Sequence, residues 1–263
     1  MTETITSPQN PRIRALRRLR ERKHREQEGV FMAEGEDMLE AALRHGAVPR
    51  AVYSVPEPPP DLAALLARLP AATERVTASA AALAAAGSLG SGARVIGVWE
   101  PRWASLDHPP RRLGDEGPVL HLQDVADPGN VGTVLRAARA FGARLVVLSA
   151  RTADPFGPKA VRAGMGAVFG APLARSDFAA ARAALGGHRA IALVPGAGRP
   201  LREVPLEGPV LFALGAERAG LPADVIAACD EIAHVPLDRT AADSLNVAMA
   251  ATLCLYEYRA DRA

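Results

Sequence analysis

The sequence predicts an α/β fold whose C-terminal part is built around a parallel sheet. After residue 118, apolar strand-like segments alternate with helical segments, and these strands are almost continuously apolar. Strands of this kind are typical of a parallel sheet that helices cover on both faces. Before residue 101 the chain mixes shorter helices and strands, which predicts a second, smaller α/β domain.

The composition sets bounds on the size and the class of the protein. The chain has 263 residues, of which 49% are hydrophobic, so two modest domains with substantial cores are possible. No apolar run is long and charge-free enough to span a bilayer, and the basic N-terminus lacks the apolar segment of a secretory signal. Cys229 and Cys254 are the only cysteines, and we expect both to be reduced thiols in the cytoplasm.

The smaller domain begins with a helix at Asn10 and Pro11, because a capping side chain there precedes a proline at the first helical position. Ile13, Leu16 and Leu19 share one face of this helix. The elements expected after it are a short apolar stretch at 29–34, a helix at 35–44 closed by Gly46, strands at 50–55, 74–78 and 93–100, and helices at 61–69 and 79–87 capped by Asp61 and Ser79.

Between residues 101 and 118 this pattern stops, and the segment is rich in proline, glycine and charge. We therefore predict an N-terminal domain over residues 1–107, a linker over 108–117 and a C-terminal domain over 118–263. In the C-terminal domain, strands are expected at 118–123, 143–149, 189–194, 209–215 and 232–237, and helices at about 131–140, 158–163, 178–185, 222–228 and 244–258.

Cations crowd one short segment near the N-terminus, with Glu21 as the only acidic residue among them. They are Arg12, Arg14, Arg17, Arg18, Arg20, Arg22, Lys23 and Arg25. Clustered positive charge is typical of a surface that binds a polyanion, and nucleic acid is the default candidate. A solvated helix face without a ligand is the alternative.

Three segments of the C-terminal domain carry candidate chemistry, and the first is DPGNVGTVLR at 127–136. Pro128 and Gly129 make a turn after a strand, and Asn130 can cap the helix that follows. In an α/β sheet such turns lie at the carboxyl edge, where ligands bind. Arg136 follows Asn130 by six residues, and its long side chain can reach back toward the start of the helix. A helix cap followed by a surface arginine is the alternative.

The second segment is FALGAERAGLP at 212–222. A buried strand ends at Gly215, Glu217 follows, and Gly220 precedes a further helix. Two glycines around one carboxylate allow the backbone to approach a ligand closely. An ordinary connection from strand to helix, with an exposed glutamate, is the alternative.

The third segment is VPLDRTAADSLNVAMA at 235–250, where a polar loop leads into a long apolar helix. Ser244 can serve as the N-cap of that helix. Asn246 lies near the start of an otherwise apolar helix, and it needs hydrogen-bond partners if it is buried.

The sequence disfavours several other kinds of site. Leu201 stands where a dinucleotide fingerprint beginning at Gly196 needs its third glycine, and neither a Walker motif nor a nucleophile elbow occurs. The six histidines are scattered without ligand spacing, so no metal site is expected.

Together the three segments read N-x-G-x-x-x-R, G-x-E-x-x-G and S-x-N, and this order resembles the motifs of the SpoU/TrmH family of RNA ribose 2′-O-methyltransferases. The resemblance covers roughly residues 117–259 and includes DPFGPKAVRAGMGAVF at 154–169. The N-terminal part is similar to the substrate-binding domain of the family, through ITSPQNPRIRALRRL at 5–19 and GVFMAEGEDMLEAAL at 29–43.

This resemblance implies a homodimeric enzyme that uses S-adenosylmethionine and carries a deep trefoil knot at the C-terminal end of its catalytic domain. The residues implied to hold the cofactor are Leu214, Gly215, Gly220, Val235, Leu237, Leu245 and Asn246. The implied catalytic residues are Asn130, Arg136, Glu217, Ser244 and Asn246.

Roles for these residues follow from the reaction that the family catalyses. Counterparts of Arg136 are proposed to be the base, but a guanidinium keeps its proton at any ordinary pH. We therefore expect Arg136 to hold a phosphate and stabilise the developing alkoxide, and Asn130 to orient Arg136 or the ribose. Glu217 is expected to hold its loop, with pairing to an arginine as one way to do so, while Ser244 and Asn246 shape the pocket.

The expected substrate is ribosomal RNA, which would contact the basic N-terminal segment, and transfer RNA is the alternative. A catalytically silent RNA-binding or ribosome-assembly protein on the same scaffold is an alternative of another class, although a silent protein need not keep all five catalytic residues together. A nucleotide-dependent dehydrogenase is disfavoured by the failed glycine spacing. Neither a membrane nor a metal is an expected partner.

Overall fold

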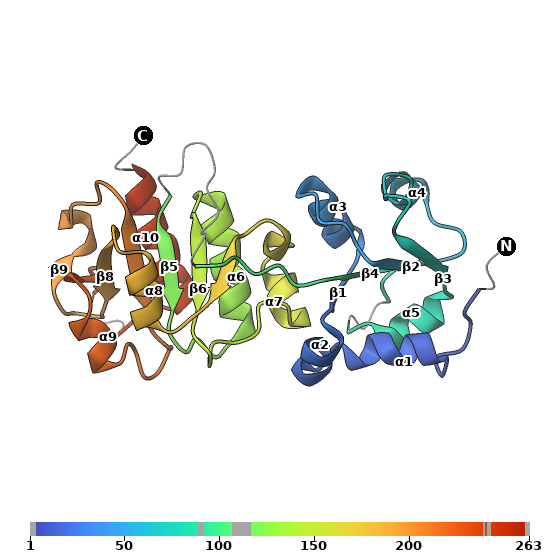
Figure 1. Cartoon of the computed structure of the whole chain (residues 1–263), viewed down its shortest axis with the longest axis horizontal. Helices are drawn as coiled ribbons and strands as arrows, with labels where there is room; N and C mark the ends of the chain where they lie inside the picture. The colour runs from blue at the N-terminus through green and yellow to red at the C-terminus, as the bar shows by residue number, and fades with distance from the viewer. Residues whose placement is uncertain (1–3, 89–91, 107–116, 239, 241–242, 261–263) are drawn as a thin grey trace. The chain divides into compact units, whose positions relative to one another are not determined.

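The computed structural model describes the chain except residues 1–3, 89–91, 107–116, 239, 241–242 and 261–263. The chain forms two compact units: the first comprises Met1–Pro101 and Asp154–Gly170, and the second comprises Arg102–Ala153 and Ala171–Ala263 (Figure 1). The predicted linker lies almost wholly outside the described residues. The contiguous domain bounds expected from the sequence stay a prediction, because compact packing does not test which segments fold independently.

The first unit contains a four-stranded sheet in the order β1-β4-β2-β3. Its elements are α1 (Pro11–Arg18), α2 (Arg22–Glu28), β1 (Phe31–Glu34), α3 (Glu36–Arg44), β2 (Ala51–Ser54), α4 (Pro60–Ala67), β3 (Glu74–Thr77), α5 (Ala80–Ala86), β4 (Val95–Trp99), α7 (Pro158–Ala163) and the 3-10 helix η1 (Ala167–Phe169). Strand β4 pairs antiparallel with β1 and β2, while β2 and β3 are parallel. The sheet is therefore mixed.

Two cores hold the first unit together, because strand residues alternate between the faces of the sheet. On one face Leu16 of α1 and Leu83 of α5 pack with Ile96 of β4. The other face carries an aromatic cluster: the ring centroids of Phe31 and Phe156 lie 4.9 Å apart, and those of Trp99 and Phe169 lie 4.7 Å apart. The segment 154–170 thus completes a core that begins far away in the sequence.

The start of the first helix is confirmed, since the Asn10 side chain accepts a hydrogen bond of 2.9 Å from the Arg12 amide. The basic segment, however, is two helices, because α1 ends at Arg18 and α2 begins only at Arg22. The expected cap of α4 is wrong: the helix begins at Pro60, whose fixed φ favours the first helical position, so Asp61 lies inside the first turn.

The second unit contains a seven-stranded sheet in the order β7-β6-β5-β10-β8-β11-β9, and every pairing in it is parallel. Its elements are β5 (Val119–Leu122), α6 (Pro128–Ala140), β6 (Leu145–Leu148), β7 (Leu173–Arg175), α8 (Phe178–Ala184), β8 (Arg189–Leu193), β9 (Arg199–Pro200), the 3-10 helix η2 (Leu201–Glu203), β10 (Val210–Leu214), α9 (Ala223–Ala227), β11 (Glu231–His234) and α10 (Val247–Ala260). The predicted parallel α/β fold is confirmed, whereas the trefoil knot stays a prediction.

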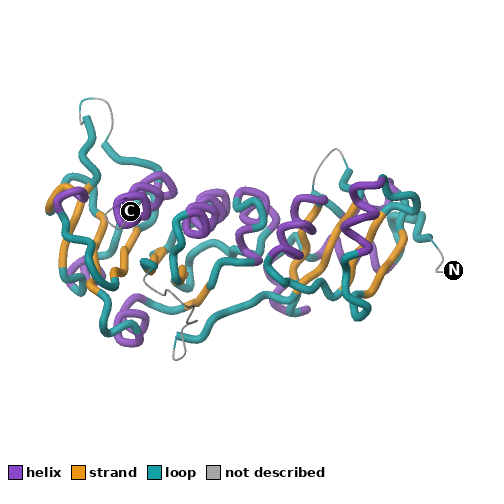
Figure 2. Tube along the Cα trace, turned by 90° about the horizontal axis from the view of Figure 1, so that it is seen from above, coloured by secondary structure: helices purple, strands orange, loops and turns teal. Residues whose placement is uncertain are grey.

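Helices cover both faces of this sheet, as the strand composition predicts (Figure 2). On one face, Phe178 of α8 and Val225 of α9 pack with strand residues such as Val147 and Leu211. Helices α6 and α10 pack against each other, and Figure 2 shows them on the other side of the sheet. Within the described residues, no helix is long and apolar enough to cross a membrane.

Candidate active site

The candidate site lies at the carboxyl edge of the parallel sheet in the second unit. Strands β5 and β10 pair directly, with Leu122 opposite Leu214, so the segments that follow them begin side by side. Strand β8 lies on the other side of β10, and β11 pairs with β8. The topology therefore brings the first two sequence motifs to neighbouring positions, as expected for a ligand site in an open α/β sheet.

Asn130 connects all three motifs through one side-chain amide. Its Nδ2 donates a hydrogen bond of 2.6 Å to Oε1 of Glu217, and its Oδ1 accepts one of 2.9 Å from Nδ2 of Asn246. Asn246 in turn accepts from the amide of Ala248 at 2.8 Å, which caps the start of α10. The three motifs thus form one hydrogen-bonded chain, Glu217–Asn130–Asn246.

The cap of α6 differs from the expected one. Helix α6 begins at Pro128, and Asp127 is its N-cap, with Oδ1 accepting a hydrogen bond of 3.0 Å from the Asn130 amide. The Asn130 side chain therefore does not cap α6. Similarly, Asn246 takes the capping position before α10, and Ser244 lies in the loop ahead of it as an exposed residue.

Two of the expected contacts of this site are not found. Glu217 accepts its hydrogen bond from Asn130, and in the described part of the chain it has no ion pair with an arginine. No hydrogen bond joins Asn130 to Arg136 among the described residues, and the Asn130 amide instead bonds to Glu217 and Asn246. Arg136 is exposed on α6 and makes no hydrogen bond or ion pair to the described residues.

A cavity of about 320 Å³ opens beside this hydrogen-bonded chain. Six residues that the resemblance assigns to the cofactor line it: Leu214, Gly215, Gly220, Val235, Leu237 and Leu245. Glu217 and Ser244 also line it, whereas Asn246, the seventh assigned residue, does not. Most of the lining is aliphatic, with a few polar groups, as is usual for small-molecule sites.

Sequence reasoning missed one wall of this cavity. Leu193, Val194 and Pro195 line it at the carboxyl end of β8. Gly196 and Gly198, which follow directly, fail the dinucleotide spacing, so no motif indicates a site here. The place of this segment directly after a buried strand next to β10 was the signal that could have indicated it, since every parallel strand ends at the same edge.

Glycine allows the close backbone approach that shapes the cavity. A Cβ atom on Gly215 would lie 2.2 Å from the carbonyl carbon of Gly220, which excludes any side chain at this position. Gly220 has φ +67°, and its amide donates to the carbonyl of Ala216 at 2.9 Å, which closes a tight turn over residues 216–220. This turn holds Glu217 at the edge of the cavity.

The loop before Asn130 is held by a second network. Asp124 has φ +58°, which is uncommon for a residue with a side chain. Its carboxylate accepts a hydrogen bond of 2.7 Å from the Ser149 hydroxyl and pairs with Arg151, and the Arg151 guanidinium lowers the pKa of Asp124. These contacts, together with the hydrogen bond that the Asp124 amide donates to the Ser149 hydroxyl, fix the chain between β5 and α6.

The basic N-terminal segment divides into exposed and buried cations. Arg12, Arg14, Arg17, Arg18, Arg20, Arg22 and Lys23 are exposed. Arg25 is only 6% exposed: Nη2 pairs with Asp154 at 2.7 Å, and Nη1 donates to the carbonyls of Leu19 and Arg20. Arg25 therefore ties α2 to Asp154, and its burial leaves little of the guanidinium exposed for the expected RNA contact.

No group of histidine, cysteine or acidic side chains among the described residues is arranged to hold a metal ion. Neither the cavity nor the chain Glu217–Asn130–Asn246 has the donor set of a metal centre.

The sequence is similar to known methyltransferases along most of its length. Residues 117–256 match the SpoU rRNA Methylase family, and residues 10–95 match the MRM3-like substrate binding domain. A Synechocystis sp. protein named as an uncharacterized tRNA/rRNA methyltransferase is 32% identical over 97% of this chain and 93% of its own length. The 23S rRNA (guanosine(2553)-2′-O)-methyltransferase RlmP of Bacillus subtilis is 28% identical over 97% of this chain and 98% of its own.

Solved structures agree with these matches. An AdoMet-bound rRNA methyltransferase from Sinorhizobium meliloti has a TM-score of 0.88 and 30% identity, and the match covers 98% of both chains. The SpoU methyltransferase AviRb from Streptomyces viridochromogenes, in complex with AdoMet, has a TM-score of 0.86 and 27% identity over 97% of this chain and 98% of that one. The chain belongs to the SpoU rRNA Methylase family.

Proposed function

We propose that the protein transfers a methyl group from S-adenosylmethionine to the 2′-oxygen of a ribose in ribosomal RNA. The observation that carries this proposal is the hydrogen-bonded chain Glu217–Asn130–Asn246 beside the cavity at the carboxyl edge of the sheet. RlmP methylates a guanosine ribose of 23S rRNA, as its name states, and matches nearly the whole of this chain. Membership of the same family supports the same class of reaction here.

The cavity suits S-adenosylmethionine in size and in chemistry. Its aliphatic walls, such as Leu214, Val235 and Leu245, fit the apolar faces of an adenine ring, and the glycine turn at 215–220 lets the backbone approach a ligand. The two structures bound to AdoMet, from S. meliloti and S. viridochromogenes, support this choice of cofactor. When bound, the cofactor supplies an activated methyl group.

The residues of the chain itself then have to place the ribose and help its hydroxyl to lose a proton. Asn130 holds Glu217 and Asn246 at fixed positions, so we assign it a positioning role at the edge of the cavity. Arg136, exposed and without a partner in the described residues, is assigned to a phosphate beside the target ribose and to the developing negative charge on the 2′-oxygen. Ser244 lines the cavity and can contact either ligand.

The exposed cations of α1 and of the start of α2 are proposed to contact the RNA backbone. A contact of this kind releases counterions, so binding should weaken steeply as salt is added. The match of residues 10–95 to a substrate binding domain supports this placement. We further propose a cytoplasmic homodimer, as the resemblance to the family implies.

Transfer RNA is the second candidate substrate, and the name of the Synechocystis relative leaves both RNAs open. The silent scaffold is a weaker candidate, because Asn130, Glu217 and Asn246 are joined by hydrogen bonds where a binding protein would need no such arrangement.

The decisive test is methyl transfer from labelled S-adenosylmethionine to ribosomal and transfer RNA made in vitro, followed by nuclease digestion and mass spectrometry of the nucleosides. A 2′-O-methylated nucleoside from rRNA alone is the expected result. Transfer to neither RNA, with the cofactor still bound, would move the substrate to a ribosomal particle. Loss of cofactor binding as well would contradict the enzyme proposal and favour the silent scaffold.

A further inference from the structure

The first unit has a cavity of its own, with a volume of about 280 Å³. It lies between helices α1 and α2 and residues of strands β2, β3 and β4. The floor is apolar and is formed by Leu16, Leu19, Val30 and Val98. The rim is polar and carries Arg12, Arg18, Arg50, Tyr53, Glu28 and Glu74.

Several polar groups on this rim have no partner among the residues that the structure describes. Arg12 pairs with Glu74 at 2.8 Å, but the exposed side chains of Arg18 and Arg50 make no hydrogen bond or ion pair to the described residues. The Tyr53 hydroxyl likewise has no hydrogen bond within the described part of the chain, although the residue is only 8% exposed. Burial raises the pKa of Tyr53, so its hydroxyl keeps its proton and can donate it to a ligand.

The combination of an apolar floor with cations, a hydroxyl donor and a carboxylate matches the chemistry of an unpaired nucleotide. Guanidinium groups bind phosphate, apolar surface covers the face of a base, and carboxylate or hydroxyl groups can bond its polar edge. Proteins that recognise RNA by sequence mostly bind single-stranded nucleotides in this way.

We propose that this cavity binds one unpaired nucleotide of the substrate RNA, with its phosphate on Arg18 and Arg50 and the polar edge of its base toward Tyr53 and Glu28. The proposal rests on the RNA methyltransferase function given above. It adds a recognition site in the first unit to the reaction site in the second.

Adjacent arginines of α1 provide the comparison that tests it. Arg17 and Arg18 are both exposed, but only Arg18 lines the cavity, so general loss of positive charge is the same in the two alanine variants. We expect Arg18→Ala to raise the KM for RNA about ten-fold and Arg17→Ala only about two-fold, with kcat unchanged in both. Arg68→Ala, in an exposed arginine after α4, should leave KM within experimental error.

Two further variants act on the cavity without removing a charge. Ala15→Trp fills it from the exposed side of α1, and Tyr53→Phe removes one hydroxyl that has no partner in the described protein. Both should raise the KM for RNA, by about ten-fold and about three-fold respectively, while kcat and cofactor binding measured by calorimetry stay unchanged. Circular dichroism of each variant checks the fold.

The outcomes separate this proposal from the proposed function. Equal effects of the Arg17 and Arg18 variants, or an unchanged KM for Ala15→Trp with the fold intact, would overturn the nucleotide site while methylation itself persists. If the unaltered protein neither binds nor methylates rRNA in filter-binding and transfer assays, the proposed function fails first. If free nucleoside monophosphates bind saturably and Arg18→Ala leaves this binding intact, the nucleotide site is also contradicted.

Discussion

Asn130 is the residue on which the candidate active site depends, because one amide group joins Glu217 to Asn246. An Asn130→Asp variant keeps the shape but replaces the Nδ2 donor by an oxygen that faces the Glu217 carboxylate. We expect methyl transfer to fall about 100-fold, since small displacements of catalytic groups have effects of that size. Single-turnover methylation of rRNA measures it.

The control for this variant is Thr133→Val on the same helix, whose hydroxyl bonds only to the Gly129 carbonyl among the described residues. It should retain nearly full activity. An Asn130→Asp enzyme within about three-fold of the parent rate would show that the hydrogen-bonded chain does not matter for turnover.

Arg136 is predicted to act on the substrate, not on the protein. Lysine keeps the positive charge but loses the planar pair of donors that grips a phosphate. Arg136→Lys should therefore lower kcat/KM by about 1,000-fold while S-adenosylmethionine still binds, because removing one donor to a developing oxyanion has comparable effects. Calorimetric titration checks that the cofactor still binds, and methyl-transfer kinetics measure the fall in kcat/KM. Near-normal turnover would refute the role of Arg136 in contacting the substrate.

His121 makes stability depend on pH. It is fully buried in β5, and burial lowers its pKa to about 4. The unfolded chain takes up a proton near pH 6.5, whereas the folded chain resists it, so stability is full above pH 6.5 and is lost as pH falls toward 4. We expect the unfolding free energy to drop by about 2 kcal/mol between pH 7.5 and pH 5 from this residue.

Urea denaturation at the two pH values tests the His121 prediction, with His121→Leu as the comparison. The leucine variant should lose less stability on acidification than the parent. If both lose the same amount, another group causes the dependence on pH.

At the scale of residues, the sequence identifies important side chains more reliably than it identifies the contacts that they make. Asn130 and Asn246 stand out because they belong to the N-x-G-x-x-x-R and S-x-N motifs, and the two side chains bond to each other in the candidate site. The mutual contacts could not be predicted, since Asp127 competes with Asn130 for the cap of α6 and wins through its place directly before Pro128. Arg25 looked like its neighbours, because its partner Asp154 lies 129 residues away.

Among the structural elements, the turn after β10 is the most constrained. Gly215→Ala would place a methyl group against the backbone of Gly220, which must then move. Since this turn forms part of the cavity wall, we expect at least a ten-fold loss of affinity for S-adenosylmethionine. Calorimetry measures it.

Gly187→Ala is the matched control, because a Cβ atom there meets nothing within 4 Å. It should bind the cofactor like the parent protein. Equal affinity in both variants would mean that the turn relaxes without cost and that the cavity does not depend on it.

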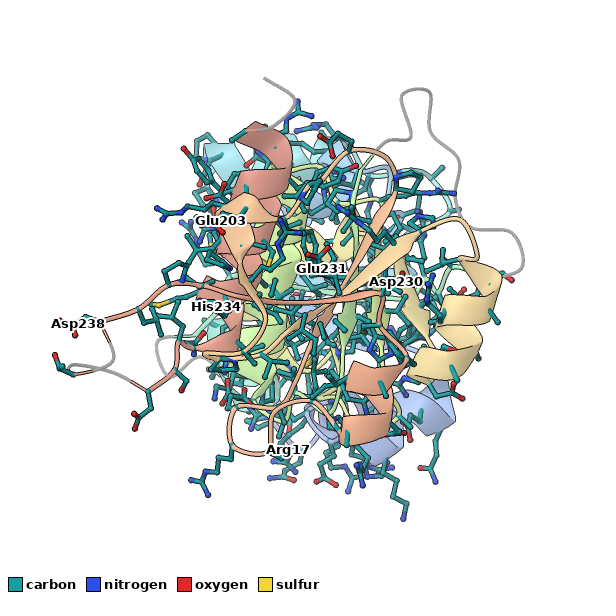
Figure 3. The ribbon with its side chains drawn as sticks, turned by 90° about the vertical axis from the view of Figure 1, so that its left-hand side faces the viewer. Arg17, Glu203, Asp230, Glu231, His234 and Asp238 are labelled. Carbon is teal, nitrogen blue, oxygen red and sulfur yellow. The ribbon has the colours of Figure 1, made fainter. Side chains whose placement is uncertain are left out.

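Five strands of the second unit were predictable from their apolar composition, but β7 and β9 were not. These two have three and two residues and lie at the edges of the sheet, and they are too short to carry a clear pattern. Figure 3 shows the end of the sheet near β11, where Asp230 precedes the strand and Glu231 is its first residue. Asp238 follows the strand and points away from the fold. Short edge strands depend on neighbours that only the folded sheet supplies.

For the whole molecule, the ion pair between Arg25 and Asp154 is the contact whose loss matters most to the first unit. The two side chains are 6% and 13% exposed, so removing one partner leaves a charge buried and unpaired. Asp154→Ala should lower the unfolding free energy by about 3 kcal/mol. Arg22→Ala breaks the exposed pair with Glu26 and should lower it by less than about 1 kcal/mol.

Chemical denaturation of the full chain compares these variants. Equal losses would mean that the buried pair gives no more stability than one in water.

The order of the three motifs made the fold and the family recognisable from the sequence, but hydrophobic patterns alone indicated only a parallel α/β sheet. The return of residues 154–170 to the first unit leaves no local trace, since it depends on packing between distant apolar side chains.

That return has a consequence for synthesis on the ribosome. When residue 101 leaves the exit tunnel, the first unit still lacks Phe156 and Phe169, so Phe31 and Trp99 have no aromatic partners from that segment to cover them. The unit can close only after residue 170 has emerged, when more than half of the chain has been translated. Completion of the first unit is therefore a late event in the synthesis of the chain. Nascent chains arrested before and after that point should differ sharply in resistance to protease.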